Sequence, residues 1–156
     1  MKKKTHQNRP KKLSVMQKSP PTYEKDFYGW TRLQANLLKN QEFEKMDIDH
    51  LIEEIESLGN SEERALESHI SNLFMHLLKI KYQPAMHTRS WDNSVKNASF
   101  QSEKILKKNP GLKPKLKEIT KDAYYSARLK ASSETGLETD IFPKKCPFKI
   151  AEIIKI

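Results

Sequence analysis

Apolar residues recur every three or four positions along most of the chain, the spacing that gathers them on one face of an α-helix. The first such run begins after Thr22, and either Thr22 or Asp26 can cap its N-terminus. Its apolar positions are Phe27, Trp30, Leu33, Leu37 and Leu38. The pattern predicts a first helix, followed by a connection from Asn40 to Met46.

The next run lies between Asp47 and Pro84, and we interpret it as two helices separated by a glycine. The first half is capped by Asp47 and has apolar positions at Ile48, Leu51, Ile52, Ile55 and Leu58. Gly59 suits the left-handed residue that follows a helix, and Asn60 with Glu63 fits a capping box that starts another. The second half is apolar at Leu66, Ile70, Leu73, Leu77 and Ile80. We therefore expect a helical hairpin that turns at Gly59 and buries both apolar faces.

Two longer helices and a short last one are expected after Pro84. The first begins at Ser90, a good N-cap, and ends at the helix-breaking sequence Asn109-Pro110-Gly111. The second runs from Leu112 to Ser133, and the last passes through Ile150, Ile153 and Ile154. No segment alternates apolar and polar residues as a strand does. The predicted fold is all-α, a single-domain bundle of about five or six helices.

Length and composition narrow the class of protein. A chain of 156 residues suits one domain, and its one cysteine, Cys146, excludes an intrachain disulfide framework. No apolar run approaches the roughly 20 residues of a membrane-spanning helix, and the lysine-rich start lacks the apolar segment of a secretory signal. We expect a cytoplasmic protein without membrane contacts.

The formal net charge of +9 is unevenly distributed. Residues 1–22 carry seven basic and no acidic side chains, residues 23–78 carry five and twelve, and residues 79–121 carry eleven and three. We expect residues 1–22 to form a disordered basic tail and residues 23–156 to fold as the helical domain. The acidic and basic thirds can pack together and screen each other, or the basic third can present a positive surface to phosphate groups.

Several short motifs resemble a known family. They are Asp26-Phe27-Tyr28-x-Trp30, Glu53-Glu54-Ile55-Glu56-Ser57-Leu58-Gly59, His76-Leu77-Leu78-Lys79, Gln83-Pro84, Arg89-Ser90-Trp91, Glu134-Thr135-Gly136-Leu137 and Phe142-Pro143-x-x-Cys146-Pro147. In this order they resemble the bacterial domain of unknown function family 29, from residue 23 to the end of the chain. The resemblance implies a small all-helical cytoplasmic domain and brings no established activity, so it leaves open whether the protein is an enzyme.

Four residues are candidates for catalysis: Glu54, Arg64, His69 and His76. Arg64 and His69 resemble the Arg-x4-His motif of the all-helical HEPN ribonucleases, in which the two residues handle the scissile phosphate. His69 and His76 would lie roughly 10 Å apart along a helix, too far to share a metal ion, so no metal site and no cofactor are predicted. For His76 and Glu54 on facing helices, the first interpretation is a buried structural pair and the alternative is a general acid–base pair.

Basic residues in the third from Lys79 to Lys121 are candidates for contacting nucleic acid. Those selected are Lys104, Lys107, Lys108, Lys113, Lys115 and Arg89. A solvated lysine face is the competing interpretation. The sequence favours an interaction or nucleic-acid-associated accessory module, which binds nucleic acid through its basic helices or tail, or binds a protein partner. A HEPN-like ribonuclease or another phosphate-cleaving enzyme is the alternative, and no pattern indicates an oligomeric state.

Overall fold

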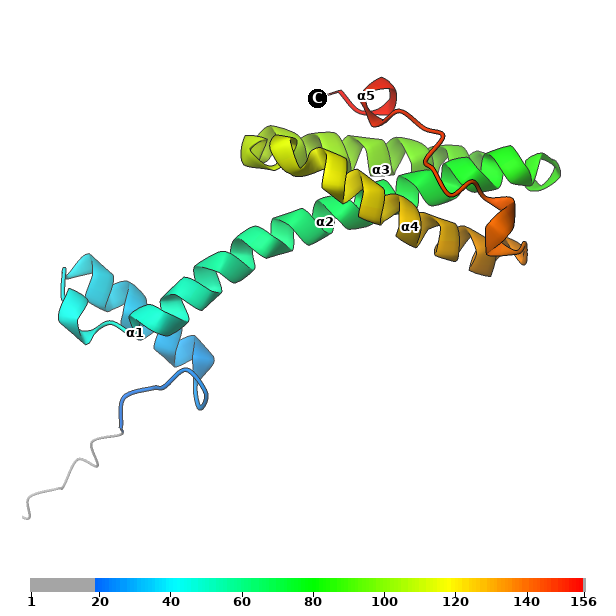
Figure 1. Ribbon diagram of the computed structural model, residues 1–156. Helices are drawn as coiled ribbons and strands as arrows, with labels where there is room; N and C mark the ends of the chain where they lie inside the picture. The colour runs from blue at the N-terminus through cyan, green and yellow to red at the C-terminus, as the bar shows by residue number, and fades with distance from the viewer. Residues whose placement is uncertain (1–18, 156) are drawn as a thin grey trace, which may run out of the picture. The chain divides into compact units, whose positions relative to one another are not determined.

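The computed structural model describes residues 19–155, and these form five α-helices without a strand (Figure 1). The α-helices are α1 (Phe27–Lys39), α2 (Ile48–Tyr82), α3 (Arg89–Lys108), α4 (Leu116–Thr135) and α5 (Ile150–Ile153). Short 3-10 turns lie between them at Phe43–Lys45, Pro84–Met86, Pro110–Lys115 and Thr139–Ile141. The all-α prediction is confirmed. Disorder was predicted for the basic tail at residues 1–22, of which residues 1–18 lie outside the described range.

The chain divides into two compact units, one that ends at Leu51 and one that spans Ile52–Ile156. The first unit contains α1 and the first turn of α2. Asp26 caps α1 as expected, because its carboxylate accepts a hydrogen bond from the Gly29 amide at 2.8 Å. Trp30 and Leu37 are the buried apolar residues of this helix.

The predicted hairpin at Gly59 is wrong, because α2 is one continuous helix of 35 residues. A glycine in a helix interior costs only about 1 kcal/mol relative to alanine and does not by itself end the helix. No proline follows until Pro84, where α2 has ended. Among residues 19–155, the glycine with a left-handed backbone is Gly136, which ends α4 as expected at a φ of 72°.

The apolar face in the first half of α2 is not buried, contrary to the prediction. Ile52, Ile55 and Leu58 are 50%, 66% and 69% exposed. The expected hairpin would have folded a second helix back along this face, and a continuous helix has no such return segment. The buried apolar residues of α2 lie from Leu66 onward, in its second half, and belong to the core.

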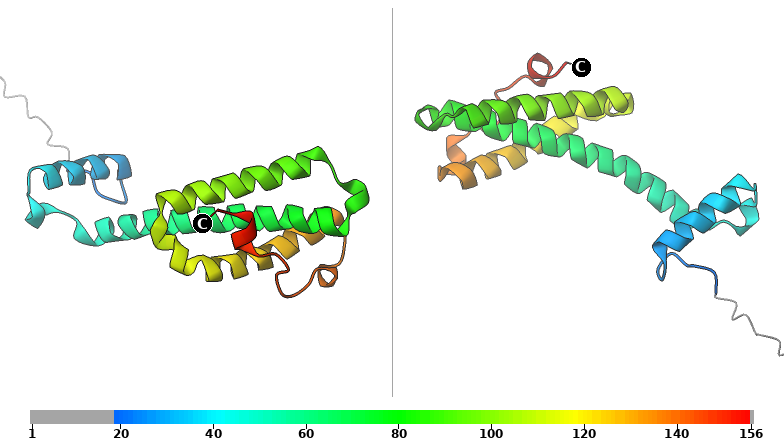
Figure 2. Two further views of the ribbon diagram at one scale, coloured as in Figure 1. Left: turned by 90° about the horizontal axis from the view of Figure 1, so that it is seen from above. Right: turned by 180° about the vertical axis from the view of Figure 1, so that it is seen from behind.

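The core of the second unit lies where α3 and α4 pack against the second half of α2 (Figure 2). From α2 come Leu66, Ile70, Leu73, Phe74 and Leu78, all fully buried. Helix α4 contributes Ala123, Ala127 and Ala131, a row of small side chains at four-residue spacing that lets the larger residues of its neighbours pack closely. Phe142 and Ile154 close the core from the C-terminal segment.

Helix boundaries differ slightly from those predicted. Thr88 rather than Ser90 precedes α3, and α4 begins at Leu116 rather than Leu112. Pro114 explains the second difference, because proline lacks the amide hydrogen that a continuing helix needs, and it lies in the 3-10 turn instead. The short last helix is confirmed as α5. Within the described range, no helix combines the length and apolar character needed to cross a bilayer.

Candidate functional site

A cleft of about 700 Å³ lies in the second unit, between one face of α4 and the segment that follows Pro143. Its lining residues are Lys117, Thr120, Lys121, Tyr124, Tyr125, Arg128, Lys144, Lys145 and Cys146. Five of these nine side chains are cationic and none is a carboxylate. We call it the cationic cleft.

The spacing of residues on α4 builds one wall of the cationic cleft. Lys117, Lys121, Tyr124 and Arg128 follow one another at intervals of four, three and four residues, which places them on the same helical face. The opposite wall is held in place by a hydrogen bond of 2.7 Å from the Tyr124 hydroxyl to the carbonyl oxygen of Pro143. Burial raises the pKa of Tyr124 to about 12, so this hydroxyl stays protonated and continues to donate.

Two buried polar atoms of residues that line the cleft have no hydrogen-bond partner among residues 19–155. They are Nε of Arg128 and Oγ1 of Thr120. Arg128 is only 9% exposed, and its Nη2 donates to the carbonyl oxygen of Thr139 at 2.9 Å. The nearest carboxylate to Arg128, that of Asp140, lies 4.0 Å away and is 92% exposed, so water screens the pair. The exposed lysines beside this buried guanidinium form a site suited to an anion.

Cys146 lies on the C-terminal wall and has no sign of a reactive thiol. Burial raises its pKa, the opposite of what an activated nucleophile requires. Its Sγ donates to the carbonyl oxygen of Phe148 at 3.5 Å. The cysteine therefore serves packing in this wall.

A second, polar cleft of about 400 Å³ brings together the candidate residues His69 and His76. Glu134 of α4, Asn72 and Asn97 also line this cleft. Nδ1 of His76 is buried without a hydrogen-bond partner among the described residues. Burial and the nearby Lys79 cation lower the pKa of His76, while Glu134 acts in the opposite direction. The imidazole is therefore neutral at pH 7.

Glu134 is already engaged by a buried lysine. Lys79 is 8% exposed, its Nζ lies 2.5 Å from Oε2 of Glu134, and it also sits 4.4 Å from the centre of the Trp91 ring. Just after the end of α2, Gln83 donates to the carbonyl oxygen of Thr135 at 3.0 Å. These contacts tie α2 to the end of α4, so the carboxylate of the polar cleft has a structural role.

The predicted pairing of Glu54 with His76 is wrong. Both residues belong to the same straight run of α2, and 22 residues separate them by about 33 Å. Arg64 and His69 also diverge, since five residues turn a helix through about 500°, which leaves their side chains about 140° apart. Arg64 is exposed, and His69 lines the polar cleft without it.

The basic residues predicted to contact nucleic acid are split into several groups. Nζ of Lys108 lies 2.6 Å from Oε1 of Glu62, and Nζ of Lys115 lies 2.6 Å from Oε2 of Glu63. The Lys108 hydrogen bond holds the pKa of Glu62 below its usual value, and the Glu63 hydrogen bond raises that of Lys115. At these positions the acidic and basic thirds screen each other. We call these four residues the paired lysine group.

The remaining predicted residues lie elsewhere on α3 and the turn after it. Lys107 and Lys113 line a small cleft of about 270 Å³ that also contains Glu103. Lys104 lies next to Lys107 on the exposed face of α3. Arg89 begins α3, 15 residues before Lys104 and thus about 22 Å away. No single surface unites the six.

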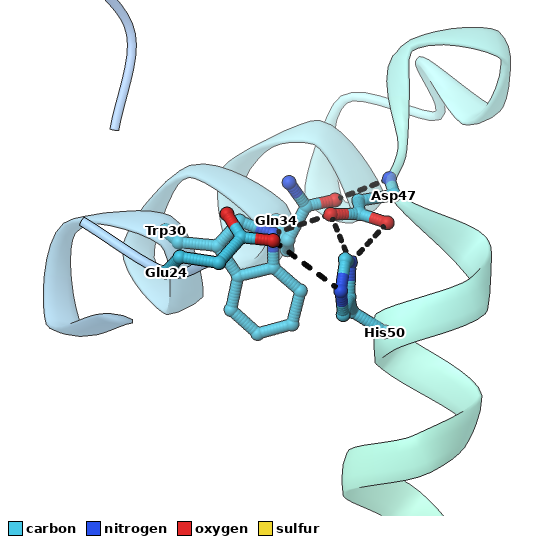
Figure 3. Close-up of polar contacts among 5 residues, drawn as sticks. All are labelled: Glu24, Trp30, Gln34, Asp47 and His50. Atoms are coloured by element: carbon cyan, nitrogen blue, oxygen red, sulfur yellow. Dashed lines mark hydrogen bonds and ion pairs between the residues drawn. The ribbon is translucent and has the colours of Figure 1, made fainter. Parts of the chain in front are cut away.

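In the first unit, Asp47 is the centre of a polar network that joins α1 to the start of α2 (Figure 3). Its carboxylate accepts from Nε1 of Trp30 at 3.0 Å and lies 2.8 Å from Nδ1 of His50, and its amide donates to Oε1 of Gln34 at 2.9 Å. The hydrogen bond with His50, followed by that with Trp30, lowers the pKa of Asp47. The carboxylate expected to cap α2 thus bonds to side chains of both helices.

His50 is enclosed on two sides in this network. Its Nε2 lies 3.8 Å from Oε1 of Glu24, and its ring stacks on Tyr23 with 4.1 Å between ring centres. An imidazole oriented by a carboxylate is also a common catalytic arrangement. Here the Tyr23 ring and the Glu24 carboxylate, which precede α1, both contact His50 of α2. His50 therefore has a structural role.

Comparison with known proteins decides the family. The profile of the family described as Domain of unknown function DUF29 matches residues 22–156, most of the chain. The chain belongs to the DUF29 family. No curated protein and no solved structure matches it. The family description carries no activity, so any function of this DUF29 chain has to be argued from its own clefts and charges.

Several motifs that carry the DUF29 resemblance meet in the second unit. Lys79 and Gln83, from the end of α2, contact Glu134 and Thr135 at the end of α4. Trp91, from the start of α3, covers the Lys79 cation. Segments more than 50 residues apart in sequence thus form one junction. The residues of these motifs have a structural role there, because they contact one another.

Sequence reasoning on this DUF29 chain counts Lys117 and Lys121 in the basic third but does not predict the cationic cleft. A usable signal was present in the four, three and four residue spacing from Lys117 to Arg128, which marks one helical face. The contribution of Lys144 and Lys145 could not be foreseen, since it depends on how the C-terminal segment folds back. Within residues 19–155, no three histidine, cysteine or acidic side chains gather closely enough to hold a metal ion.

Proposed function

We propose that this DUF29 chain is a nucleic-acid-associated accessory module that binds phosphate groups through the cationic cleft. One observation carries the proposal: five cationic side chains line a cleft that no carboxylate lines. At the paired lysine group, by contrast, glutamates of α2 already neutralise the lysines. Phosphate gains most from cations that have no protein counter-ion nearby.

Electrostatics gives the proposal a measurable signature. Lys117, Lys121, Lys144 and Lys145 are exposed, so in the free protein they attract mobile counter-ions. Nucleic acid binding releases counter-ions, and the logarithm of the affinity falls with the logarithm of salt concentration by about 0.7 to 0.9 per phosphate contacted. Three or four contacts therefore weaken binding by roughly 20- to 150-fold when salt rises about fourfold.

The test is binding of labelled RNA and DNA, single-stranded and duplex, to the full chain at low and moderate salt. The variant Lys121→Glu/Lys145→Glu reverses two charges in the cleft and is expected to lower affinity at least about tenfold. The matched control, Lys104→Glu/Lys107→Glu, makes the same charge change on α3 and is expected to alter affinity by less than about threefold. Circular dichroism checks that both variants remain helical.

Two results would contradict the assignment to the cleft. The first is a larger loss in the α3 control than in the cleft variant. The second is loss of all binding when Lys2, Lys3, Lys4, Lys11 and Lys12 of the basic tail are replaced by glutamine. Absence of binding by the wild-type chain to every nucleic acid at low salt would remove the proposal altogether.

A protein-interaction role is the second candidate, favoured by the exposed apolar face of α2. Ile52, Ile55 and Leu58 lie within two successive turns and are at least half exposed. Contiguous exposed apolar surface often marks a protein contact. Sedimentation over a hundredfold range of concentration tests association between copies. Ile55→Glu should abolish association that uses this face, and a concentration-independent monomer would remove that form of the role.

A HEPN-like ribonuclease, the other alternative, needs an arginine and a histidine at one phosphate. Arg64 and His69 diverge by about 140° around α2, which gives this activity little support. Incubation of the chain with single-stranded RNA tests it directly. Cleavage that Arg64→Ala and His69→Ala both abolish would revive the ribonuclease.

A further inference from the structure

We propose that the cationic cleft receives one unpaired nucleotide, with its base among the apolar walls and its phosphate at the lysine rim. The inference rests on the proposed nucleic-acid binding and adds which form is recognised, a nucleotide whose base is free of a duplex. The same chemistry is available from a single strand and from a free nucleotide.

The shape of the cleft is the first reason. A surface that only follows a phosphate backbone needs no cavity, whereas about 700 Å³ lies within the range of sites that enclose small organic ligands. The phosphates of a duplex lie on its outside with the bases stacked within, so a duplex would leave the interior of the cleft unfilled. An unpaired nucleotide can place its base there.

The walls provide the second reason, because they are largely apolar despite the cationic side chains. The aliphatic stems of the lysines, the rings of Tyr124 and Tyr125, and Cys146 supply carbon and sulfur surface. The charged ends of lysine side chains remain in solvent at the rim. An apolar interior below a cationic rim matches a ligand with a flat aromatic part and an anionic part.

Tyr125 is the residue best placed to stack on a base. It is 63% exposed although it lines the cleft, so its ring surface is available to a ligand. Tyr124 is only 3% exposed and its hydroxyl already donates to Pro143, so it forms a fixed wall. Stacking on an aromatic side chain tolerates any base, since every base has a flat π-surface.

Arg128 and Thr120 place buried polar groups at the wall of the cleft. Arg128 is nine-tenths buried, its orientation is fixed by the bond from Nη2 to Thr139, and its Nε has no partner within the described residues. Thr120 Oγ1 is likewise buried and unpartnered there. Both atoms are covered from solvent in the free chain, so each bonds to a base edge or a phosphate oxygen only when its side chain turns toward the cleft.

The experiment compares three labelled ligands of equal length and charge at one low salt concentration. They are a single-stranded oligonucleotide, the same backbone with abasic sites at its central positions, and a hairpin duplex. The full chain is expected to bind the single strand at least about fivefold more tightly than either of the others. A nucleoside monophosphate is added as a competitor in a separate arm.

Variants of Tyr125 assign the preference to the cleft. Tyr125→Ala should weaken single-strand binding about five- to tenfold and leave abasic and duplex binding unchanged. Tyr125→Phe keeps the ring and should bind as the wild type does. Because Tyr125 is exposed, neither change removes a core residue.

Each outcome decides the inference. Suppose that the chain binds all three ligands with equal affinity and that Lys121→Glu/Lys145→Glu loses this binding. That result would overturn the nucleotide site and would still support phosphate binding in the cleft. Equal competition by a polyglutamate peptide would also overturn it, because only negative charge would then be recognised. Failure of every ligand to bind would overturn both proposals. Strong Tyr125-dependent competition by the monophosphate would identify the free nucleotide as the source of the ligand.

Discussion

Two groups of lysines in the second unit have different neighbours. At the paired lysine group, Lys108 and Lys115 each lie 2.6 Å from a glutamate oxygen of α2. In the cationic cleft, Lys117, Lys121 and their neighbours line a hollow that contains no carboxylate. Residues of one type, only a few positions apart on the chain, therefore present very different potentials to an anionic ligand.

The comparison teaches that a count of basic residues in sequence does not locate a binding surface. The glutamates that neutralise Lys108 and Lys115 come from positions 46 and 52 residues earlier, brought there by the packing of α2. Surface ion pairs of this kind add little stability. Their larger effect here is to remove two lysines from the surface available to phosphate.

The largest effect should come from giving the cleft a counter-ion of its own. Thr120→Glu introduces a carboxylate among the residues that line the cleft. We expect nucleic-acid affinity at low salt to fall about tenfold or more, because the new charge repels phosphate and pairs with the cations of the cleft. Thr120→Gln is the matched neutral control, and fluorescence anisotropy measures both. Equal affinity of the two variants would contradict the comparison.

The reverse change should make the paired lysine group resemble the cleft. Glu62→Gln/Glu63→Gln releases Lys108 and Lys115 while preserving side-chain size. We expect nonspecific affinity for nucleic acid to rise about three- to tenfold at low salt, and the gain to disappear at moderate salt. Glu53→Gln/Glu56→Gln makes the same charge change on an exposed part of α2. A similar gain in that control would mean that net charge, not local pairing, is responsible.

Glu62 and Glu63 reach Lys108 and Lys115 on a helix that continues through Gly59. A substitution at Gly59 tests whether the helix is continuous there. A Cβ added at Gly59 meets no atom within 4 Å. In a helix interior, Gly59→Ala should raise the free energy of unfolding by about 0.5 to 1 kcal/mol. Urea denaturation measures the change. A lower free energy of unfolding would indicate a left-handed backbone at Gly59, as in the hairpin predicted from the sequence, and would contradict the continuous helix.

The smallest effect concerns pH. The pKa of Glu62 is lowered by Lys108, so the pair stabilises the fold above the usual glutamate pKa of 4.5, and this contribution is lost as pH falls through the lower folded value. The pKa of Lys115 is raised, so its contribution is present below 10.5 and is lost as pH rises through the higher folded value. Melting temperatures of wild type and Glu62→Gln across acid pH should converge below pH 4.5. A constant difference would contradict the pairing.

Much of the fold could be predicted from the sequence, since helical periodicity, the Asp26 cap and the Gly136 stop act locally. Periodicity does not reveal what covers an apolar face, and the same pattern along α2 is exposed at Ile55 and fully buried at Leu73. The predicted turn at Gly59 is wrong for a similar reason. The roughly 1 kcal/mol preference against helix at glycine is smaller than the gain from packing the second half of α2.

The cationic cleft was beyond prediction because one of its walls is tertiary. The α4 wall is visible in the spacing from Lys117 to Arg128. The other wall exists only because Phe142 is buried and Tyr124 bonds to Pro143, 19 residues away. These contacts depend on where the C-terminal segment packs, which no local pattern encodes.

The most direct test is the acetylation rate of each lysine in the full chain, measured with and without single-stranded RNA. One sample then reports on the paired lysine group and on the cationic cleft together. The account predicts protection of Lys117, Lys121, Lys144 and Lys145 at low salt, loss of that protection at moderate salt, and unchanged rates at Lys108 and Lys115. Protection confined to Lys104, Lys107 and Lys113, with the cleft lysines unchanged, would contradict it.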